Sequence, residues 1–235
     1  MTQTVPPRVR TRPLLGWWFD VLLVAAFVGL TVALANGHLL ALDQRVADWA
    51  LGHQPGLIYW PARAFNYLGQ GGQVLMPVSL ALTGILAYRT RSWRAVLPFA
   101  AAFVLTYVTI GPLKIWADRA APRFDGPEKV VLFNPYASGP KAMSYPSGHM
   151  ANSLVWYAVI ALLVALLLQR PLRGWESLAV RVLPVVILFG TTVYTGFHWL
   201  TDSIAGVLLG LVLARLIERV PWERVIPRPR PAARA

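Results

Sequence analysis

The 235-residue chain is too apolar, and carries too few charges, for an ordinary soluble domain. Hydrophobic residues make up 56% of it, charged residues make up 14%, and its mean hydropathy is +0.52, whereas soluble chains are about 25% charged. The same figures exclude a disordered or collagen-like chain. The net charge of +12 is therefore interpreted as a membrane-topology signal, and we expect no nucleic-acid partner.

Six apolar runs predict an all-α fold, in which residues 1–235 form a single integral membrane domain with six transmembrane spans. An apolar run of about 18 residues is needed to cross a bilayer as a helix. The first run is longer than the apolar core of a signal peptide, so it is interpreted as a retained span. The spans are expected near residues 14–35, 74–88, 95–116, 148–168, 178–197 and 203–217.

The segments between the spans carry further predictions. Residues 39–53 place charged side chains among apolar ones at helical spacing, which predicts an amphipathic helix on the membrane or against the bundle. The span near 74–88 is short, and its alternative start lies near Leu57, as a broken helix. Asp20 is expected to reach headgroup water as an interfacial acid. Residues 117–147 form one long polar loop.

The distribution of basic residues predicts the orientation of the bundle. Six spans place both termini on one side, together with 15 of the 22 basic residues: Arg8, Arg10, Arg12, Arg89, Arg91, Arg94, Arg170, Arg173, Arg181, Arg215, Arg219, Arg224, Arg228, Arg230 and Arg234. The opposite side has seven: Arg45, Arg63, Lys114, Arg119, Arg123, Lys129 and Lys141. Basic loops remain in the cytoplasm. The basic N-terminus (1–13) and tail (218–235) are therefore expected to be cytoplasmic, and the 117–147 loop extracytoplasmic, in a multi-pass protein of the cell membrane.

The start of the fourth span is suited to an anion. In the segment Tyr-Pro-Ser-Gly-His at 145–149, Ser147 can cap the helix and Gly148 lets a ligand approach the backbone. The free N–H groups and the positive dipole end of a helix N-terminus favour phosphate. His149 falls in the first turn, beside any phosphate bound there. The alternative is a capped helix whose histidine has no binding role.

Two other segments carry polar residues on the same side. His198 and Asp202 are four residues apart and share one face of a helix. A carboxylate that binds one imidazole nitrogen leaves the other as a lone-pair nucleophile, although the pattern alone is also typical of a polar pair at the edge of a span. Lys114 and Arg119 end the third span on the side disfavoured for positive charge, which favours a bound anion over snorkelling.

Together these segments resemble the three signatures of the phosphatidic acid phosphatase type 2 superfamily, which includes lipid phosphate phosphatases and vanadium haloperoxidases. The family pattern is Lys-x6-Arg-Pro, then Pro-Ser-Gly-His, then Ser-Arg-x5-His-x3-Asp. The resemblance covers about residues 95–217, and the Pro-Ser-Gly-His segment at 146–149 and the His198-x3-Asp202 pair match without change.

The resemblance implies a role for each matching residue. His198 would attack phosphorus and form a phosphohistidine, His149 would protonate the leaving oxygen, and Asp202 would orient His198. The residues implied to hold phosphate oxygens are Lys114, Ser147 and the Gly148 N–H. The family uses no metal and no cofactor; here cysteine is absent, and the four histidines, at 38, 53, 149 and 198, are too scattered to predict a zinc site.

Two arginines of the family pattern are replaced. Ala121 stands seven residues after Lys114, and Thr192 stands six residues before His198. The loss of two charge-assisted hydrogen bonds without compensation costs about 3–6 kcal/mol. The candidate replacements are Arg119, which is the best placed, Arg123 and Lys141. Alternatively, the site acts on another phosphorylated substrate or acceptor, or catalysis is largely lost.

The resemblance implies a membrane-embedded phosphatase that hydrolyses a lipid phosphate or pyrophosphate at the outer leaflet. A polyprenyl or a glycerolipid phosphate fits equally, and the bilayer is the second expected partner; the sequence carries no signal for an oligomeric state. One alternative is a lipid-linked phosphotransferase with the same histidine nucleophile. The other is a degenerate membrane protein that binds lipid phosphate without catalysis.

Overall fold

The computed structural model describes residues 16–229. Within this range six helices are long and apolar enough to cross a membrane: Trp17–Ala35, Gly71–Thr90, Trp93–Ala117, Gly148–Leu168, Gly174–Tyr194 and Leu200–Val225. The predicted all-α, six-span architecture is confirmed. The cytoplasmic placement expected for residues 1–13, and for the end of the tail at 230–235, falls outside the described residues.

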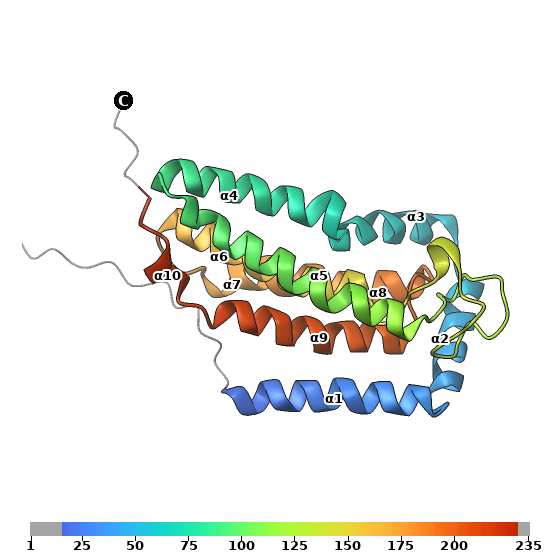
Figure 1. The fold of residues 1–235 in the computed structure, drawn as a ribbon. Helices are drawn as coiled ribbons and strands as arrows, with labels where there is room; N and C mark the ends of the chain where they lie inside the picture. Colours follow the sequence, from blue (N-terminus) through green and yellow to red (C-terminus); the bar gives the residue numbers. More distant parts are fainter. Residues whose placement is uncertain (1–15, 230–235) are drawn as a thin grey trace, which may run out of the picture.

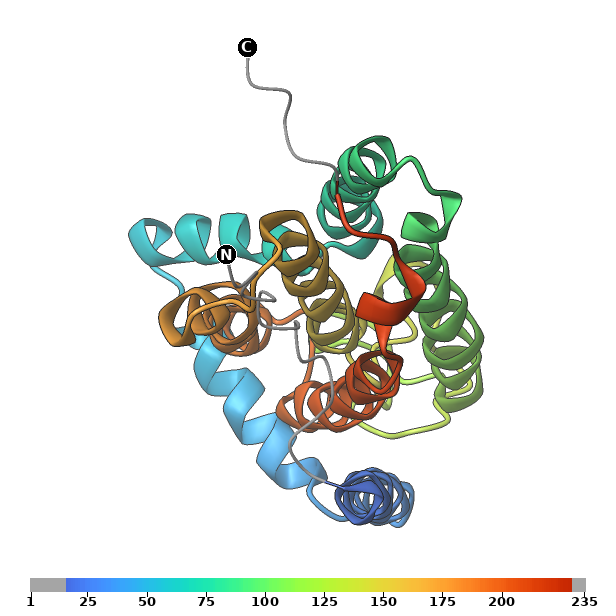
Figure 2. The same cartoon turned by 90° about the vertical axis from the view of Figure 1, so that its left-hand side faces the viewer.

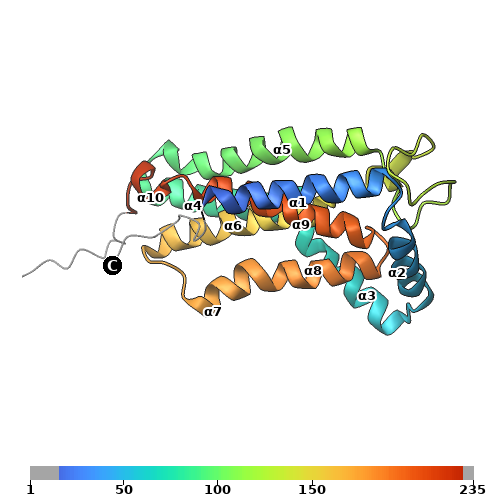
Figure 3. The same cartoon turned by 90° about the horizontal axis from the view of Figure 1, so that it is seen from below.

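The helices are α1 (Trp17–Ala35), α2 (Leu40–Gly52), α3 (Gly56–Phe65), α4 (Met76–Thr90), α5 (Leu97–Ala117), α6 (Gly148–Leu168), α7 (Gly174–Ser177), α8 (Leu183–Tyr194), α9 (Leu200–Glu218) and α10 (Trp222–Val225). The long helices run side by side, with α10 at one end of the bundle and α2, α3 and the long loop at the other (Figures 1 and 3). The described chain therefore begins and ends at the bundle end opposite the loop.

Helix α6 forms the centre of the bundle. In the view along the helices it lies inside a ring made by α4, α5, α8 and α9 (Figure 2). In its most apolar 18-residue stretch, 67% of the residues are buried inside the protein, whereas the corresponding figure for α1 is 22%. An apolar helix buried on all sides needs no polar face, and accordingly α6 has only apolar residues after Ser153, apart from Tyr157. The start of α6, which carries the predicted anion site, is thus held on the most rigidly packed element.

Small residues bring α9 against α6. Gly206 and Gly210 are four residues apart on one face of α9, the spacing that allows close approach of helices in membranes. A Cβ at Gly206 would lie 2.6 Å from the Ser147 carbonyl oxygen, and one at Gly210 would lie 2.9 Å from the Cα of Ala151. No larger residue fits there, so these glycines set the distance between the two helices that carry the predicted site.

Helix α1 is attached to α9 by a buried ion-pair cluster. Asp20 is only 5% exposed and pairs with Arg215 at 2.5 Å and with Arg219. This differs from the expectation that Asp20 reaches headgroup water, because the two arginines of the last turns of α9 lie beside it. The pairing satisfies charges that would be costly at this depth.

The expected amphipathic helix and the broken helix are both present. Helix α2 packs against α8 and α9 at the loop end of the bundle, with Asp43 buried and Trp49 exposed. Helix α3 is followed by a 3₁₀ turn at Asn66–Gly69 and a π turn that leads into α4. A helix therefore does begin near Leu57, but the candidate span begins at Gly71, after the break.

Candidate active site

The three predicted segments meet at the loop end of the bundle. There the end of α5, the start of α6, the junction of α8 with α9 and one face of α3 enclose a cavity of about 710 Å³. The cations that line it are Arg63, Lys114, Arg123 and Lys141, and among the described residues no carboxylate lines it. A cavity with cations and no acidic residue favours an anionic ligand.

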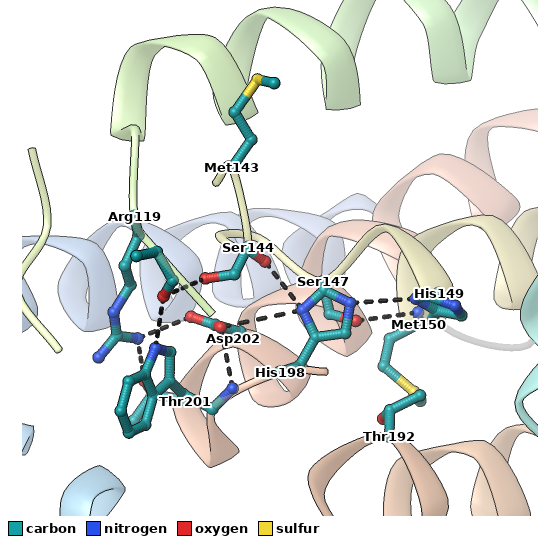
Figure 4. Close-up of polar contacts among 12 residues, drawn as sticks. Arg119, Met143, Ser144, Ser147, His149, Met150, Thr192, His198, Thr201 and Asp202 are labelled. Carbon is teal, nitrogen blue, oxygen red and sulfur yellow. Dashed lines mark hydrogen bonds and ion pairs between the residues drawn. The ribbon is translucent and has the colours of Figure 1, made fainter. Parts of the chain in front are cut away.

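The two predicted catalytic histidines are in direct contact. His149 Nδ1 lies 3.1 Å from His198 Nε2, within hydrogen-bond distance (Figure 4), and the two rings are nearly edge to face, at 70°. Both side chains line the cavity. The imidazoles come from the first turn of α6 and from the segment between α8 and α9, 49 residues apart in the sequence, so the fold alone brings them together.

The hydrogen bonds of His198 define its tautomer. Its Nδ1 lies 3.0 Å from the Ser144 carbonyl oxygen. A carbonyl oxygen only accepts, so Nδ1 must carry the proton. Nε2 of the neutral ring is then a lone pair that accepts from the Nδ1–H of His149. The ring nitrogen that faces His149 is therefore the one with the lone pair.

Asp202 acts on His198 from a longer distance than the resemblance implied. Its Oδ2 lies 3.9 Å from His198 Nδ1, which is longer than a hydrogen bond, and accepts instead from the Trp199 backbone N–H at 2.9 Å. The Ser144 carbonyl, which the sequence did not single out, takes the hydrogen bond. Asp202 therefore acts on His198 through its negative charge, and its side chain caps the N-terminus of α9.

Asp202 belongs to a buried charge cluster with Arg119 and Asp43, of which Figure 4 shows the contact between Arg119 and Asp202. Arg119 donates from Nη1 to Asp202 Oδ1 at 2.6 Å and from Nη2 to Asp43 Oδ2 at 2.7 Å. All three side chains are fully buried. Arg119 also donates to Thr201 Oγ1 and to the Val130 carbonyl oxygen. The cluster ties α2, the loop and the start of α9 to one guanidinium.

The predicted role of Arg119 as a phosphate ligand needs correction. Its guanidinium is 0% exposed and lies outside the cavity lining. Its donors are used by Asp43, Asp202, Thr201 and Val130. The reason is that the α5 helix ends at Ala117, and the chain then turns through Asp118, at φ 36°, so that Arg119 points into the protein.

At the start of α6, Ser147, which was predicted to hold phosphate, is fully buried and lies outside the cavity lining. Ser147 caps the helix by accepting from the Met150 N–H at 3.3 Å, and its own N–H donates to the Asp202 carbonyl oxygen at 2.9 Å. Gly148 lines the cavity, and a Cβ there would lie 3.0 Å from Lys114 Cε. Lys114 donates from Nζ to the Met143 carbonyl oxygen at 2.5 Å. The lysine and the helix start therefore face the same space.

The loop is held in place by backbone hydrogen bonds to the end of α5. The Ser144 N–H donates to the Arg119 carbonyl oxygen at 2.6 Å, and the Ala121 N–H donates to the Lys141 carbonyl oxygen at 2.8 Å. Trp199 donates from its indole to the Ala120 carbonyl oxygen at 2.7 Å. These bonds fix Ser144 where it orients His198, a long-range pairing that no local sequence signal shows.

The other predicted ligands are divided between cavity and surface. Arg123 lines the cavity but donates to the Thr195 carbonyl oxygen and to Gln54, each at 2.6 Å. Lys141 lines its rim, with 46% of its side chain exposed, and pairs with Asp125. Arg63 and Asn152 also line the cavity and were not predicted. Within residues 16–229 no group of three or more metal-binding side chains is clustered.

The fold and the site together indicate the class of protein. The chain is a helical membrane protein in which two histidines are in contact near the capped start of the central helix, beside a lysine. The family model described as the PAP2 superfamily matches residues 95–226. The chain therefore belongs to the PAP2 superfamily, as the resemblance indicated.

Two comparisons with individual proteins agree with this family. The chain is similar to phosphatidylglycerophosphatase B of Bacillus subtilis (strain 168), at 26% identity over 201 residues, covering 83% of this chain and 92% of the relative. Its fold is similar to the crystal structure of a transmembrane PAP2-type phosphatidylglycerolphosphate phosphatase from Bacillus subtilis, with a TM-score of 0.68 and 22% identity. That match covers 84% of this chain and 93% of the other.

The environment of His198 predicts a pH dependence. Burial lowers the pKa of His198 from its usual 6.5, the charge of Lys114 acts in the same direction, and Asp202 and the Ser144 carbonyl oppose it. The ring is therefore neutral at pH 7, and a reaction that needs its lone pair is lost only when the pH falls through the lowered pKa. We expect the acid limb of kcat/KM to reflect an apparent pKa below 6.5.

The variant Asp202→Asn tests the assignment of this limb. Loss of the carboxylate removes a charge that raises the pKa of His198, so the limb shifts to lower pH while the rate falls. Comparison with wild type on the same substrate cancels the ionisation of the substrate phosphate. An acid limb that moves upward in Asp202→Asn would show that another group controls it.

Proposed function

We propose that this chain is a membrane-embedded phosphatase that removes the phosphate of a lipid phosphate or pyrophosphate by way of a phosphohistidine. The observation that carries the proposal is the contact between His149 and His198 in a cavity lined by cations. One histidine presents a lone pair and the other a proton donor. A phosphoryl group that enters between the separated rings can therefore be attacked on one side while its leaving oxygen is protonated on the other, as an in-line double displacement requires.

In the first step, His198 Nε2 attacks phosphorus and the bond from phosphorus to the lipid oxygen breaks. His149 gives its proton to that oxygen, and the dephosphorylated lipid leaves. In the second step, water attacks phosphorus, His149 takes a proton from it, and the N–P bond breaks to release inorganic phosphate. Lys114 and the Gly148 N–H, which line the cavity, would hold the non-bridging oxygens, and Ser147, which is fully buried outside the lining, would act by capping α6. No step in this scheme calls for a metal ion.

The contact between the histidines also constrains the reaction path. At 3.1 Å the two nitrogens leave no room for a phosphoryl group between them. Binding of substrate must therefore separate the rings, which exchanges the histidine–histidine hydrogen bond for one to a phosphate oxygen. Nε2 of His149 has no hydrogen-bond partner among the described residues, so the His149 ring has one fewer attachment to break when it moves.

A lipid substrate fits the surroundings of the cavity. Tyr59 and Arg63 of α3 line it, whereas Leu57, Ile58 and Trp60 of the same helix are exposed at 89%, 56% and 67%. A helix with one face on a polar cavity and the other apolar and exposed is suited to a headgroup boundary. The lipid tail can stay in the bilayer while its phosphate enters the cavity.

Phosphate release by the full chain in mixed micelles tests the function. We expect inorganic phosphate from phosphatidylglycerophosphate, the substrate that the name of the B. subtilis relative indicates, with EDTA present. His198→Ala should abolish release, and His149→Ala should reduce it about 10²- to 10⁴-fold, the usual contribution of a general acid. His53→Ala, an exposed histidine at the same end of the bundle, is the matched control.

The outcomes separate the alternatives. Release by His198→Ala or His149→Ala at the wild-type rate would exclude the mechanism. A new phosphorylated product in place of free phosphate, when an alcohol acceptor is supplied, would identify a phosphotransferase. Failure of the wild type both to release phosphate and to bind vanadate, which resembles the pentacoordinate transition state, would identify a degenerate site. Polyprenyl diphosphate is the second substrate to assay.

We also propose that the cavity faces outward and that the termini are cytoplasmic, because 15 of the 22 basic residues are expected on the terminal side. The chain has no cysteine, so single cysteines report sidedness without a background. We expect Ser138→Cys, in the exposed loop, to react with an impermeant maleimide on intact cells, and Arg94→Cys to react only after permeabilisation. The reverse pattern would invert the topology.

A further inference from the structure

The positions of the two replaced family arginines bring no cation to the cavity. Ala121 lines the cavity with a methyl group only. Thr192 is fully buried outside it, and its hydroxyl donates to the Leu188 carbonyl oxygen at 2.7 Å. If the transferring phosphoryl group is to be neutralised by more than Lys114, another residue must supply the charge.

Three candidate cations are already engaged. Arg119 forms ion pairs with Asp43 and Asp202 outside the cavity. Arg123 has Nε on the Thr195 carbonyl oxygen and Nη2 on Gln54. Lys141 pairs at the surface with Asp125, whose side chain is 92% exposed. Each of them already has an oxygen acceptor, so binding to phosphate would compete with a contact present in the structure.

Arg63 differs from these three. It lies in the last turn of α3 and lines the cavity. Its guanidinium carbon lies 4.4 Å from the centre of the Phe197 ring. Among residues 16–229 no group forms a hydrogen bond or an ion pair with the guanidinium of Arg63, whose contact is with the Phe197 ring. It therefore enters the cavity with all five N–H donors available.

Phe197 places Arg63 beside the reacting groups. The Phe197 ring contacts both the guanidinium of Arg63 and the ring of His149, whose centre lies 5.8 Å from its own. Phe197 also directly precedes His198 in the sequence. A guanidinium held over an aromatic ring keeps its N–H donors in its own plane, where they can bind two oxygens of a phosphate at once.

We propose that Arg63 is the second phosphate-binding cation of the site and takes the place of the replaced family arginines. This inference rests on the proposed function. Arg63 would donate two N–H groups to non-bridging oxygens of the phosphoryl group, opposite Lys114 and the start of α6. The charge on these oxygens is then neutralised from a helix outside the matched family segment, which begins at residue 95.

Arg63→Ala tests the proposal in the full-length protein in mixed micelles. We expect kcat/KM for phosphate release to fall about 10- to 100-fold, the loss of a charge-assisted hydrogen-bonded pair, and inhibition by vanadate to weaken by a similar factor. Arg63→Lys keeps the charge but not the planar guanidinium, so its kcat/KM and its vanadate inhibition should lie between those of wild type and Arg63→Ala. Added guanidinium ion should restore part of the activity to Arg63→Ala and none to Arg63→Lys.

The matched control is Arg45→Ala, an exposed arginine of α2 at the same end of the bundle, which should behave as wild type. Wild-type vanadate inhibition in Arg63→Ala would overturn the proposal, as would a loss of activity unaccompanied by weaker vanadate inhibition. If Arg63→Ala does not fold, Arg63→Lys provides the test. Vanadate inhibition of Arg63→Lys equal to that of wild type would overturn the proposal that Arg63 binds two phosphate oxygens. If the wild type binds vanadate but releases no phosphate, the proposed function is wrong while the role of Arg63 can still be tested. The test is then the increase in unfolding temperature that vanadate causes in wild type and in each variant.

Discussion

The arrangement of the site depends on one buried guanidinium. Arg119 lies between the carboxylates of Asp43 and Asp202, and the side chains of all three are fully buried. Three charges removed from water are tolerated only when each is paired and hydrogen-bonded, and here Thr201 and the Val130 carbonyl complete the set. Because these groups come from α2, the loop and α9, formation of the cluster fixes all three relative to one another.

The proposed nucleophile, His198, is held in position through this cluster. Asp202 lies in the first turn of α9 and accepts at its carbonyl oxygen from the Ser147 N–H at the cap of α6, so it links the start of the helix that carries His149 to the helix that follows His198. The Arg119 carbonyl oxygen holds Ser144, whose own carbonyl sets the tautomer of His198. An arginine outside the cavity can thereby control the chemistry inside it, through the orientation of an imidazole and not through contact with phosphate.

The fold and the reacting groups could be predicted from the sequence because they follow from local patterns. Apolar runs of sufficient length gave the six spans, and the capped Pro-Ser-Gly-His segment gave the start of α6 with His149. The destinations of Arg119 and Arg63 could not be predicted. Each is decided by long-range packing: the turn at Asp118 sends Arg119 inward, and the broken helix after α3 leaves Arg63 over Phe197. Loop carbonyls such as that of Ser144 carry no side-chain signal at all.

The unfolding temperature of detergent-purified Arg119→Leu tests this account most directly, with Arg45→Ala as control. Removal of one partner from a buried ion pair costs about 3–5 kcal/mol. The account predicts a large fall in unfolding temperature relative to wild type, both without vanadate and when the two proteins are compared at saturating vanadate, because the damage lies outside the cavity. An Arg119→Leu variant that unfolds at the wild-type temperature and shows only a raised KM would contradict it, since Arg119 would then be a ligand of the substrate.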